Sequence, residues 1–225
     1  MHHQPCLLLI RHAQSQNNAL GEQLRVPDPD VTPLGVVQAA KLASVIHEFA
    51  PTKLYCSPFL RSLETTRPLS RATGLNPVVR QDLYEQGGCH SGYLPGKRVA
   101  QRGMGRSELN QRYEGWKLDP RIELDGWYDL DHFETEMEAR DRAMRIKRWF
   151  ESETIEHTHC DRVAMIIHAD FKMRLIEAFL GLSQTESIFG EVVNTSVSRM
   201  SCVEGTWKLD YWNVFTHLDR TEITN

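Results

Sequence analysis

The stretch LLLIRHAQSQNN, residues 7–18, runs from four apolar residues directly into an arginine and a histidine. The apolar run predicts a buried strand. Arg11 and His12 follow it, and ionisable side chains at the rim of a core are costly unless they reach water or are used there. One interpretation is a strand that simply meets solvent, and the other is a functional site at the end of the strand. The rest of the chain distinguishes the two.

The composition indicates an ordinary globular protein. The chain has 225 residues, of which 40% are hydrophobic and 25% charged, which predicts a single domain with one substantial core over residues 1–225. A formal net charge of −4 gives no general attraction to nucleic acid, so a small anionic ligand would need a local basic pocket. The run CLLLI, residues 6–10, is too short for a signal peptide or a membrane span. We therefore expect a cytoplasmic protein without a nucleic-acid or membrane partner.

The cysteines favour reduced thiols over a disulfide framework, because they are widely spaced and form no C-x-x-C pair. They are Cys6, Cys56, Cys89, Cys160 and Cys202. A cysteine-dependent phosphatase needs an arginine six positions after its cysteine, and no cysteine of this chain has one. The segment HTHCD, residues 157–161, contains metal-ligating residue types, but its place before a predicted strand favours a loop. The sequence predicts no metal ion and no cofactor.

Strand and helix patterns alternate along most of the chain. Apolar runs predict strands over residues 6–10, 53–57, 77–79 and 161–168, and helical spacing of apolar residues predicts helices over 33–50, 59–73, 135–153 and 170–181. Thr32 is the expected N-cap of the first helix, and Gly74 and Gly181 are expected to end two others. Residues 195–212 predict a hairpin that turns at Glu204 and Gly205. This alternation predicts a three-layer α/β fold, in which helices cover both faces of a mostly parallel central sheet.

Residues 88–134 interrupt the alternation. They are rich in glycine and aromatic residues, and they predict an insertion over one edge of the sheet. Five basic residues and one acidic residue lie between positions 97 and 112. One interpretation is a flexible cationic lid that binds the substrate through Arg98 and Arg102. The alternative is a solvated surface whose charge is neutralised by the acidic stretch that follows.

Ionisable residues follow the predicted strands. Arg11 and His12 come after the first strand, and Arg61 comes shortly after the second. Glu85 follows the third strand, and His168 ends the fourth. Ligands of open α/β sheets bind beyond the carboxyl ends of the strands. We therefore expect two arginines, two histidines and one glutamate to gather at one site.

Five segments resemble, in the same order, the signatures of the histidine phosphatase superfamily, branch 1. They are RHAQSQNN (11–18), TPLGVVQA (32–39), SPFLRSLET (57–65), LYEQGG (83–88) and IIHADF (166–171). The resemblance spans most of the chain outside the insertion and implies a phosphoglycerate mutase-like fold. It also implies that His12 is a nucleophile that forms a phosphohistidine and that Glu85 is the proton donor. The groups implied to surround the phosphate are Arg11, Arg61, His168 and Asn18. The backbone N–H of Ala169, at the start of a predicted helix, is expected to bind another phosphate oxygen with help from the helix dipole.

The chemistry of phosphate transfer requires residues of these types. The oxygen atoms of a phosphate monoester repel a nucleophile, so a catalyst has to surround their negative charge with fixed donors. Arginine stays protonated and holds such oxygen atoms through paired N–H groups. An unprotonated imidazole nitrogen attacks phosphorus, and a carboxylic acid whose pKa is raised by partial burial protonates the departing alkoxide.

The sequence departs from the family pattern at four positions. Ala13 stands where the family usually has glycine, and Gln14 replaces the commoner glutamate. Asp170 and Phe171 follow the second histidine, where small residues are usual. These last two departures predict a narrower or more acidic mouth of the site.

The resemblance favours a phosphatase acting on a small phosphorylated metabolite. A phosphomutase, which would return the phosphoryl group to a substrate, is the first alternative. The mutases resembled here typically have an acid-Arg-His-Tyr-Gly segment where this chain has LYEQGG, residues 83–88, and this difference favours hydrolysis. The second alternative is a non-catalytic protein that binds phosphorylated ligands, and the complete set of arginines, histidines and glutamate argues against it. The substrate and the oligomeric state, including a dimer, stay open.

Overall fold

The computed structural model describes residues 5–92, 96–155, 161–182 and 189–225. In this part of the chain seven strands form one sheet in the order β6-β3-β2-β7-β1-β8-β9. The strands are β1 (Cys6–Arg11), β2 (Lys53–Cys56), β3 (Val78–Val79), β6 (Lys117–Leu118), β7 (Arg162–Ile167), β8 (Val197–Val203) and β9 (Thr206–Val214). All pairings from β6 to β1 are parallel, and β8 and β9 are added antiparallel. The predicted mostly parallel sheet is confirmed.

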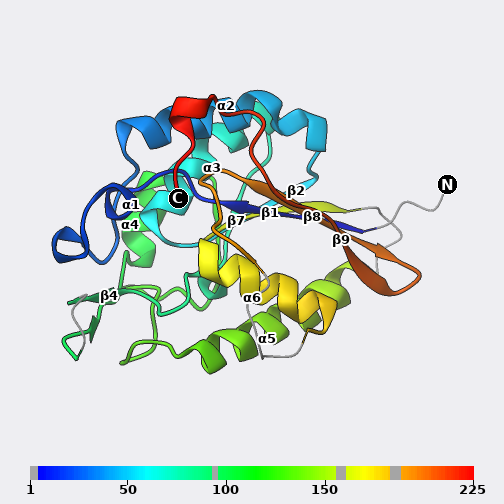
Figure 1. The fold of residues 1–225 in the computed structure, drawn as a ribbon. Coiled ribbons are helices and arrows are strands. Elements are labelled where there is room, and N and C mark those ends of the chain that lie inside the picture. The colour runs from blue at the N-terminus through cyan, green and yellow to red at the C-terminus, as the bar shows by residue number, and fades with distance from the viewer. Residues whose placement is uncertain (1–4, 93–95, 156–160, 183–188) are drawn as a thin grey trace.

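Helices cover both faces of the sheet (Figure 1). Helices α2 (Pro33–Phe49) and α3 (Leu60–Thr73) lie on one face, and α5 (Glu136–Ile155) and α6 (Ala169–Leu180) lie on the other. The shorter helices are α1 (Gln16–Ala19), α4 (Arg106–Arg112) and the 3-10 turns η1 (Glu22–Leu24), η2 (Gln81–Leu83) and η3 (Arg220–Glu222). Within the described residues, no helix combines the length and the apolar character needed to cross a membrane. The arrangement is the three-layer α/β fold expected from the sequence.

Strand β1 lies inside the sheet between β7 and β8, which explains its uninterrupted apolar sequence. Leu8 and Ile10 pack into the core beneath α2 and α3, whereas Leu7 and Leu9 pack into the core beneath α5 and α6. Successive side chains of a strand point to opposite faces of the sheet. A strand covered on both faces therefore needs apolar residues at every position.

Helix α2 begins where the sequence predicts. The hydroxyl oxygen of Thr32 accepts a hydrogen bond from the Gly35 N–H at 3.0 Å, and Pro33 occupies the first turn. Gly35 also lies against the segment that follows β1. A Cβ atom at this position would lie 2.2 Å from the carbonyl oxygen of Gln14, so only glycine allows the close approach.

The predicted reversals of the chain are also confirmed. Gly74 and Gly181 end α3 and α6 in the left-handed conformation, with φ angles of 70° and 67°. The hairpin of β8 and β9 turns at Glu204 and Gly205. Glycine enters the left-handed region without a steric penalty, which explains its place at both helix ends.

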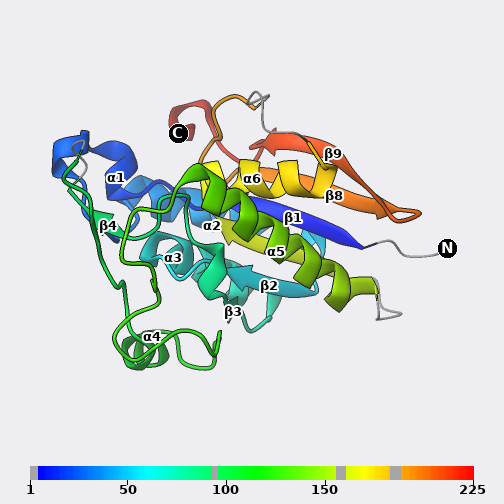
Figure 2. The ribbon, with the colours of Figure 1, turned by 90° about the horizontal axis from the view of Figure 1, so that it is seen from below.

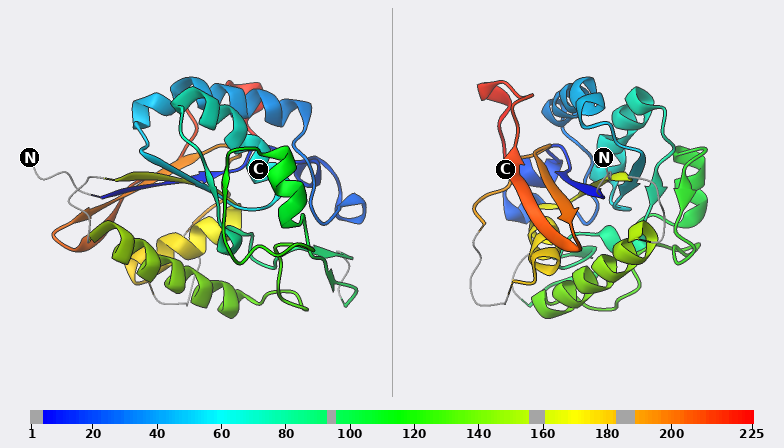
Figure 3. Two further views of the ribbon diagram at one scale, coloured as in Figure 1. Left: turned by 180° about the vertical axis from the view of Figure 1, so that it is seen from behind. Right: turned by 90° about the vertical axis from the view of Figure 1, so that its right-hand side faces the viewer.

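The insertion over residues 88–134 lies along the β3 edge of the sheet (Figures 2 and 3). It contributes the edge strand itself, because β6 pairs in parallel with β3. It also contains a small antiparallel pair, β4 (His90–Ser91) and β5 (Val99–Ala100). Trp127 and Tyr128 are fully buried in the core that includes Leu8. The insertion is therefore an integral part of the packed fold.

Candidate active site

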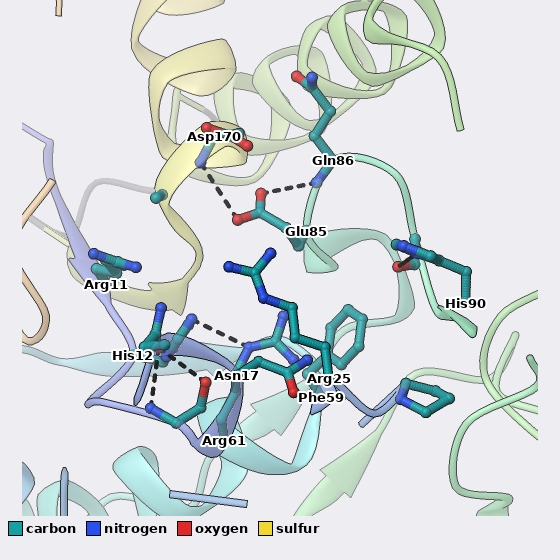
Figure 4. A pocket seen from close by; sticks show the side chains of 15 residues that line it. Arg11, His12, Asn17, Arg25, Phe59, Arg61, Glu85, Gln86, His90 and Asp170 are labelled. Carbon is teal, nitrogen blue, oxygen red and sulfur yellow. Dashed lines mark hydrogen bonds between the residues drawn. The ribbon is translucent and has the colours of Figure 1, made fainter. Parts of the chain in front are cut away.

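A pocket of about 360 Å³ lies at the carboxyl end of β1 (Figure 4). Six of the nine residues predicted for the site line it, and they are Arg11, His12, Asn18, Arg61, Glu85 and Ala169. They come from β1, the loop that follows β1, α1, α3, the segment after η2 and the first turn of α6. Segments far apart in the sequence thus converge on one pocket.

Hydrogen bonds fix both the position and the tautomer of His12. Its backbone N–H donates to the carbonyl oxygen of Ile167 at 2.8 Å. Its ring nitrogen Nδ1 lies 2.7 Å from the carbonyl oxygen of Ala13, which can only accept, so Nδ1 carries the proton. The other ring nitrogen, Nε2, accepts a hydrogen bond from Nε of Arg61 at 3.1 Å. The lone pair of the imidazole is therefore on Nε2, beside the guanidinium group.

His12 is neutral in this pocket. Burial lowers the pKa of His12 well below its usual range, and the positive charges of Arg61 and Arg11 lower the pKa further. A protonated ring would lose its hydration and would be repelled by both arginines. The imidazole therefore keeps an available lone pair at neutral pH, which is what a nucleophile needs.

Two buried guanidinium groups give the pocket its positive charge. Arg11 and Arg61 are 6% and 9% exposed. One Nη atom of Arg11 donates to the carbonyl oxygen of Val192, while its Nε atom is buried and has no hydrogen-bond partner within the described chain. Burial lowers the pKa of Arg11 to about 10, and Arg11 still stays protonated at neutral pH. Positive charge held out of water in this way favours the binding of an anion.

His168 lies next to His12 but is not among the residues that line the pocket. It is fully buried at the end of β7, and the two ring centroids are 5.0 Å apart. Its Nε2 atom lies 2.7 Å from the hydroxyl oxygen of Ser57, and its Nδ1 atom has no partner among the described residues. Burial and the charge of Arg61 lower the pKa of His168 well below its usual range. A neutral ring can donate one hydrogen bond but adds no positive charge.

Glu85 lies on the opposite side of the pocket from His12 (Figure 4). Its carboxylate accepts hydrogen bonds from the N–H groups of Gln86 at 2.8 Å and Phe171 at 2.9 Å, and a longer one from Asp170 at 3.4 Å. Burial raises the pKa of Glu85 to about 7, and the negative charge of Asp170 contributes to the rise. A carboxyl group with such a pKa can both release and accept a proton near neutrality.

Two further predicted residues, Asn18 and Ala169, also line the pocket. Asn18 uses its side-chain oxygen locally, since this atom accepts hydrogen bonds from the N–H and the hydroxyl of Ser15. Ala169 is the first residue of α6, whose N-terminus faces the site, and a helix N-terminus attracts anions. Among the residues that line the pocket and that sequence reasoning missed are four with amide, guanidinium or imidazole side chains, namely Asn17, Arg25, Gln86 and His90. No predicted strand ends directly before any of these four.

A family model described as the histidine phosphatase superfamily (branch 1) matches residues 7–214. The chain belongs to this superfamily. Phosphoserine phosphatase 1 of Hydrogenobacter thermophilus is 24% identical to it over 145 residues, which are 64% of this chain and 65% of the relative. A further protein of that organism is 42% identical over 82 residues, which are 35% of this chain and 39% of that relative. The chain therefore spans less than two thirds of the length of the curated relatives that it matches.

Solved structures share the fold of this histidine phosphatase chain. A mycobacterial glucosyl-3-phosphoglycerate phosphatase in complex with VO3 has a TM-score of 0.66 at 20% identity, covering 93% of this chain and 99% of that one. A phosphoserine phosphatase from Entamoeba histolytica in complex with phosphoserine has a TM-score of 0.64 at 17% identity, covering 95% and 99%. At such low identity the likeness concerns the fold, and the predicted fold class is confirmed.

The four residues that depart from the superfamily pattern differ in their burial and in their distance from the mouth of the pocket. Ala13 is fully buried, and Gln14 accepts a hydrogen bond from the Thr32 hydroxyl at the start of α2. Phe171 is fully buried as well, so it does not narrow the mouth of the pocket. Asp170 is exposed and lines the pocket. The departures therefore make the mouth of this histidine phosphatase site more acidic without narrowing it.

The structure does not bring Arg98 or Arg102 to the pocket, in contrast to the sequence prediction. Arg102 donates hydrogen bonds to Glu123 at 2.9 Å, to Asp125 at 3.1 Å and to the carbonyl oxygen of Tyr128 at 2.9 Å. The guanidinium of Arg98 lies over the ring of Phe133, 3.9 Å from its centre. The basic segment is thus bound within the insertion by its acidic groups, carbonyl oxygens and aromatic rings. The geometry favours internal neutralisation over a substrate-binding lid.

No cluster of three or more His, Cys, Asp or Glu residues that could hold a metal ion lies in the described part of the chain. Of the segment HTHCD, residues 157–160 lie outside the described residues. Asp161, which the structure does describe, is ion-paired with Lys53 at 2.6 Å.

Proposed function

We propose that this protein is a phosphatase that hydrolyses a small phosphate monoester through a phosphohistidine on Nε2 of His12. The observation that carries the proposal is the state of this imidazole. Its Nδ1 proton is held by the carbonyl oxygen of Ala13, which leaves a neutral Nε2 beside Arg61. Membership of the histidine phosphatase superfamily supports the same conclusion.

In the first step the substrate phosphate binds between Arg11 and Arg61. The N–H of Arg61 exchanges His12 Nε2 for a phosphate oxygen, and this frees the lone pair. Nε2 then attacks phosphorus in line with the leaving oxygen, so the P–N bond forms as the P–O bond breaks. Glu85 gives its proton to the departing alkoxide, which leaves as an alcohol. The pKa of Glu85, raised to about 7, supports this role.

In the second step water hydrolyses the phosphohistidine. The carboxylate of Glu85 accepts a proton from the attacking water molecule, the new P–O bond forms, and the P–N bond breaks. Inorganic phosphate is released, the lone pair returns to Nε2, and Glu85 is again protonated. These steps use no metal ion or cofactor.

The pocket suits a small metabolite. Its volume of about 360 Å³ lies near the lower end of the range for small-molecule sites. Relatives are named for phosphoserine and glucosyl-3-phosphoglycerate, which are both small phosphate monoesters. We propose a cytoplasmic phosphorylated metabolite of this size as the substrate.

The test is phosphate release from a panel of phosphorylated metabolites and from p-nitrophenyl phosphate. We expect release by the wild-type protein and none above background by His12→Ala. His47→Ala is the matched control, because His47 is exposed on α2 and does not line the pocket. Normal activity of His12→Ala would contradict the proposal. Incubation with phosphoglycerates separates the alternatives, since a mutase accumulates an isomer, a phosphatase accumulates inorganic phosphate, and a binding protein produces neither.

A further inference from the structure

The guanidinium group of Arg142, on α5, lies between two aromatic rings that adjoin Glu85. It is 3.7 Å from the ring centre of Tyr84 and 3.7 Å from that of Phe171. Tyr84 immediately precedes Glu85 in the chain. Phe171 donates its backbone N–H to the Glu85 carboxylate at 2.9 Å. One guanidinium thus contacts both the residue that precedes Glu85 and a residue that binds its carboxylate, although Arg142 does not line the pocket of His12.

Hydrogen bonds complete the connection between Arg142 and the segment before Glu85. One Nη atom of Arg142 donates to the carbonyl oxygens of Asp82 at 2.8 Å and Tyr84 at 2.9 Å. The Nε atom and the other Nη atom donate to the two carboxylate oxygens of Glu134 at 2.7 and 2.6 Å. Arg142 and Glu134 are only 2% and 1% exposed. The planar fork of arginine is needed for this set of contacts, and lysine cannot reproduce it.

Stability alone gives no reason to keep this ion pair. Burying two charges costs hydration free energy, and apolar residues of similar volume often stabilise a protein as well or better. The side chain of Glu85, in contrast, needs neighbouring residues to hold it in one position. Glu85 lies after the end of η2 rather than on a strand, and the next two glycines, Gly87 and Gly88, have φ angles of 94° and 73°. No regular element therefore fixes the backbone from which its side chain projects.

We propose that Arg142 is a positioning residue that, through Tyr84 and Phe171, holds the carboxyl group of Glu85 where it can protonate the leaving oxygen. The inference rests on the proposed function, in which Glu85 is the acid. Glu134 pairs with Arg142 at 2.6 Å, and the main causes of the raised pKa of Glu85 do not include the charge of Arg142, so its role toward Glu85 is to place the carboxyl group. The hydrogen bonds of Arg142 go to Glu134, Asp82 and Tyr84 and not to Arg11, His12 or Arg61, and on the phosphate side its charge makes only a minor contribution to the lowered pKa of His168.

The test compares two leaving groups. Nitrophenolate leaves without a proton, whereas the alkoxide of glycerol 2-phosphate needs one. We expect Arg142→Lys to lower kcat for glycerol 2-phosphate by about 10²-fold, the order expected for a misplaced catalytic group. The single-turnover release of nitrophenol from p-nitrophenyl phosphate should change little. The KM values for glycerol 2-phosphate and p-nitrophenyl phosphate should also change little. Arg140→Lys is the matched control, because Arg140 lies on the same helix and pairs with Glu177 of α6 at 2.5 Å.

A second variant covers the case in which Arg142→Lys does not fold. Arg142→Met combined with Glu134→Gln removes both charges, leaves no buried charge unpaired, and keeps an acceptor for the hydroxyl of Tyr84. Thermal melting checks that each variant is folded. The double variant should show the same selective loss with glycerol 2-phosphate.

Equal losses with both substrates would assign Arg142 a merely structural role and would overturn the inference, as would unchanged kcat for glycerol 2-phosphate. Glu85→Gln in the same assay separates this failure from that of the proposed function. A selective loss in Glu85→Gln without one in the Arg142 variants overturns only the inference. No selective loss in Glu85→Gln overturns the acid role of Glu85 and the inference with it.

Discussion

The two sides of the pocket are built in different ways. On the phosphate side, Arg11 and His12 come directly from the end of β1, and Arg61 comes from the first turn of α3. On the acid side, Glu85 comes from an irregular segment, and its carboxyl group is held by N–H groups of α6 and of its own chain neighbour. Regular elements, the sheet and α3, carry the first set of residues, whereas Glu85 lies on an irregular segment that depends on contacts with other parts of the chain.

The difference in construction is visible in the hydrogen bonds. The backbone N–H groups of Arg11 and His12 donate to the carbonyl oxygens of Ser196 and Ile167, so neighbouring strands hold the phosphate side. In the segment before Glu85, the carbonyl oxygens of Asp82 and Tyr84 instead accept hydrogen bonds from the guanidinium of Arg142. A substitution in a side chain can therefore disturb the acid side without disturbing the phosphate side.

Burial has opposite effects on the pKa values of the two sides. It lowers the pKa of His12, which makes the nucleophile neutral, and it raises the pKa of Glu85 to about 7, which keeps part of the acid protonated. Loss of water disfavours the charged form of both groups. In the proposed mechanism, Arg11 and Arg61 then supply the positive charge that binds the phosphate dianion of the substrate.

The largest effect is expected for the phosphate side. Arg61→Met should lower kcat/KM by about 10²- to 10³-fold with alkyl and aryl phosphates alike, because it removes a donor to the transferring phosphoryl group. Steady-state kinetics with both substrate types measure the loss. The control is Arg67→Met on the same helix, where Arg67 pairs with Glu64 at 2.8 Å. A loss confined to alkyl phosphates would mean that the two sides are not separate.

The next largest effect should be selective for the leaving group. Glu85→Gln keeps the shape of the side chain but removes the proton that the alkoxide needs. We expect a loss of about 10²-fold or more with alkyl phosphates. With p-nitrophenyl phosphate, a burst of nitrophenol should precede slow turnover, because the second step still lacks its base. Rapid-mixing absorbance measurements detect the burst, and its absence together with equal losses for both substrates would argue against the acid role.

A smaller effect concerns the pH dependence of the acid side. Glu85 has to be protonated in the first step, so kcat/KM should fall as the pH rises through its pKa of about 7. Asp170→Asn removes a negative charge that raises this pKa, so the alkaline limb should move to lower pH. The profile of kcat/KM for an alkyl phosphate, compared with wild type on the same substrate, measures the shift. An alkaline limb that stays in place or moves to higher pH would contradict the assignment of this limb to Glu85.

The smallest effect is expected in the insertion. Arg102→Ala removes bonds to Glu123 and Asp125 that are largely exposed, and it touches neither side of the pocket. Activity should change by less than about twofold, since exposed ion pairs contribute little. Kinetics with the preferred substrate provide the measurement. A large rise in KM would restore the interpretation of this segment as a substrate-binding lid.

Sequence reasoning was most successful where a residue follows an apolar run. Arg11 and His12 were predicted from their place after β1, and the structure brings them to the pocket. Arg25 and His90 were missed, because they reach the pocket from segments whose path the local pattern does not predict. Arg102 was misplaced because its partners, Glu123 and Asp125, lie about twenty residues further along the chain.

The sequence by itself determined the order of strands and helices outside the insertion and the residues at the carboxyl ends of those strands. It could do so because burial imposes a local period on each element and because parallel strands end at one edge of the sheet. Only the tertiary structure decided that the lone pair of His12 is on Nε2 and that Glu85 has a pKa near neutrality. It also decided that Arg142 contacts Tyr84 and Phe171, which adjoin Glu85. These properties depend on dehydration and on atoms from distant segments, and no local pattern in the chain encodes either.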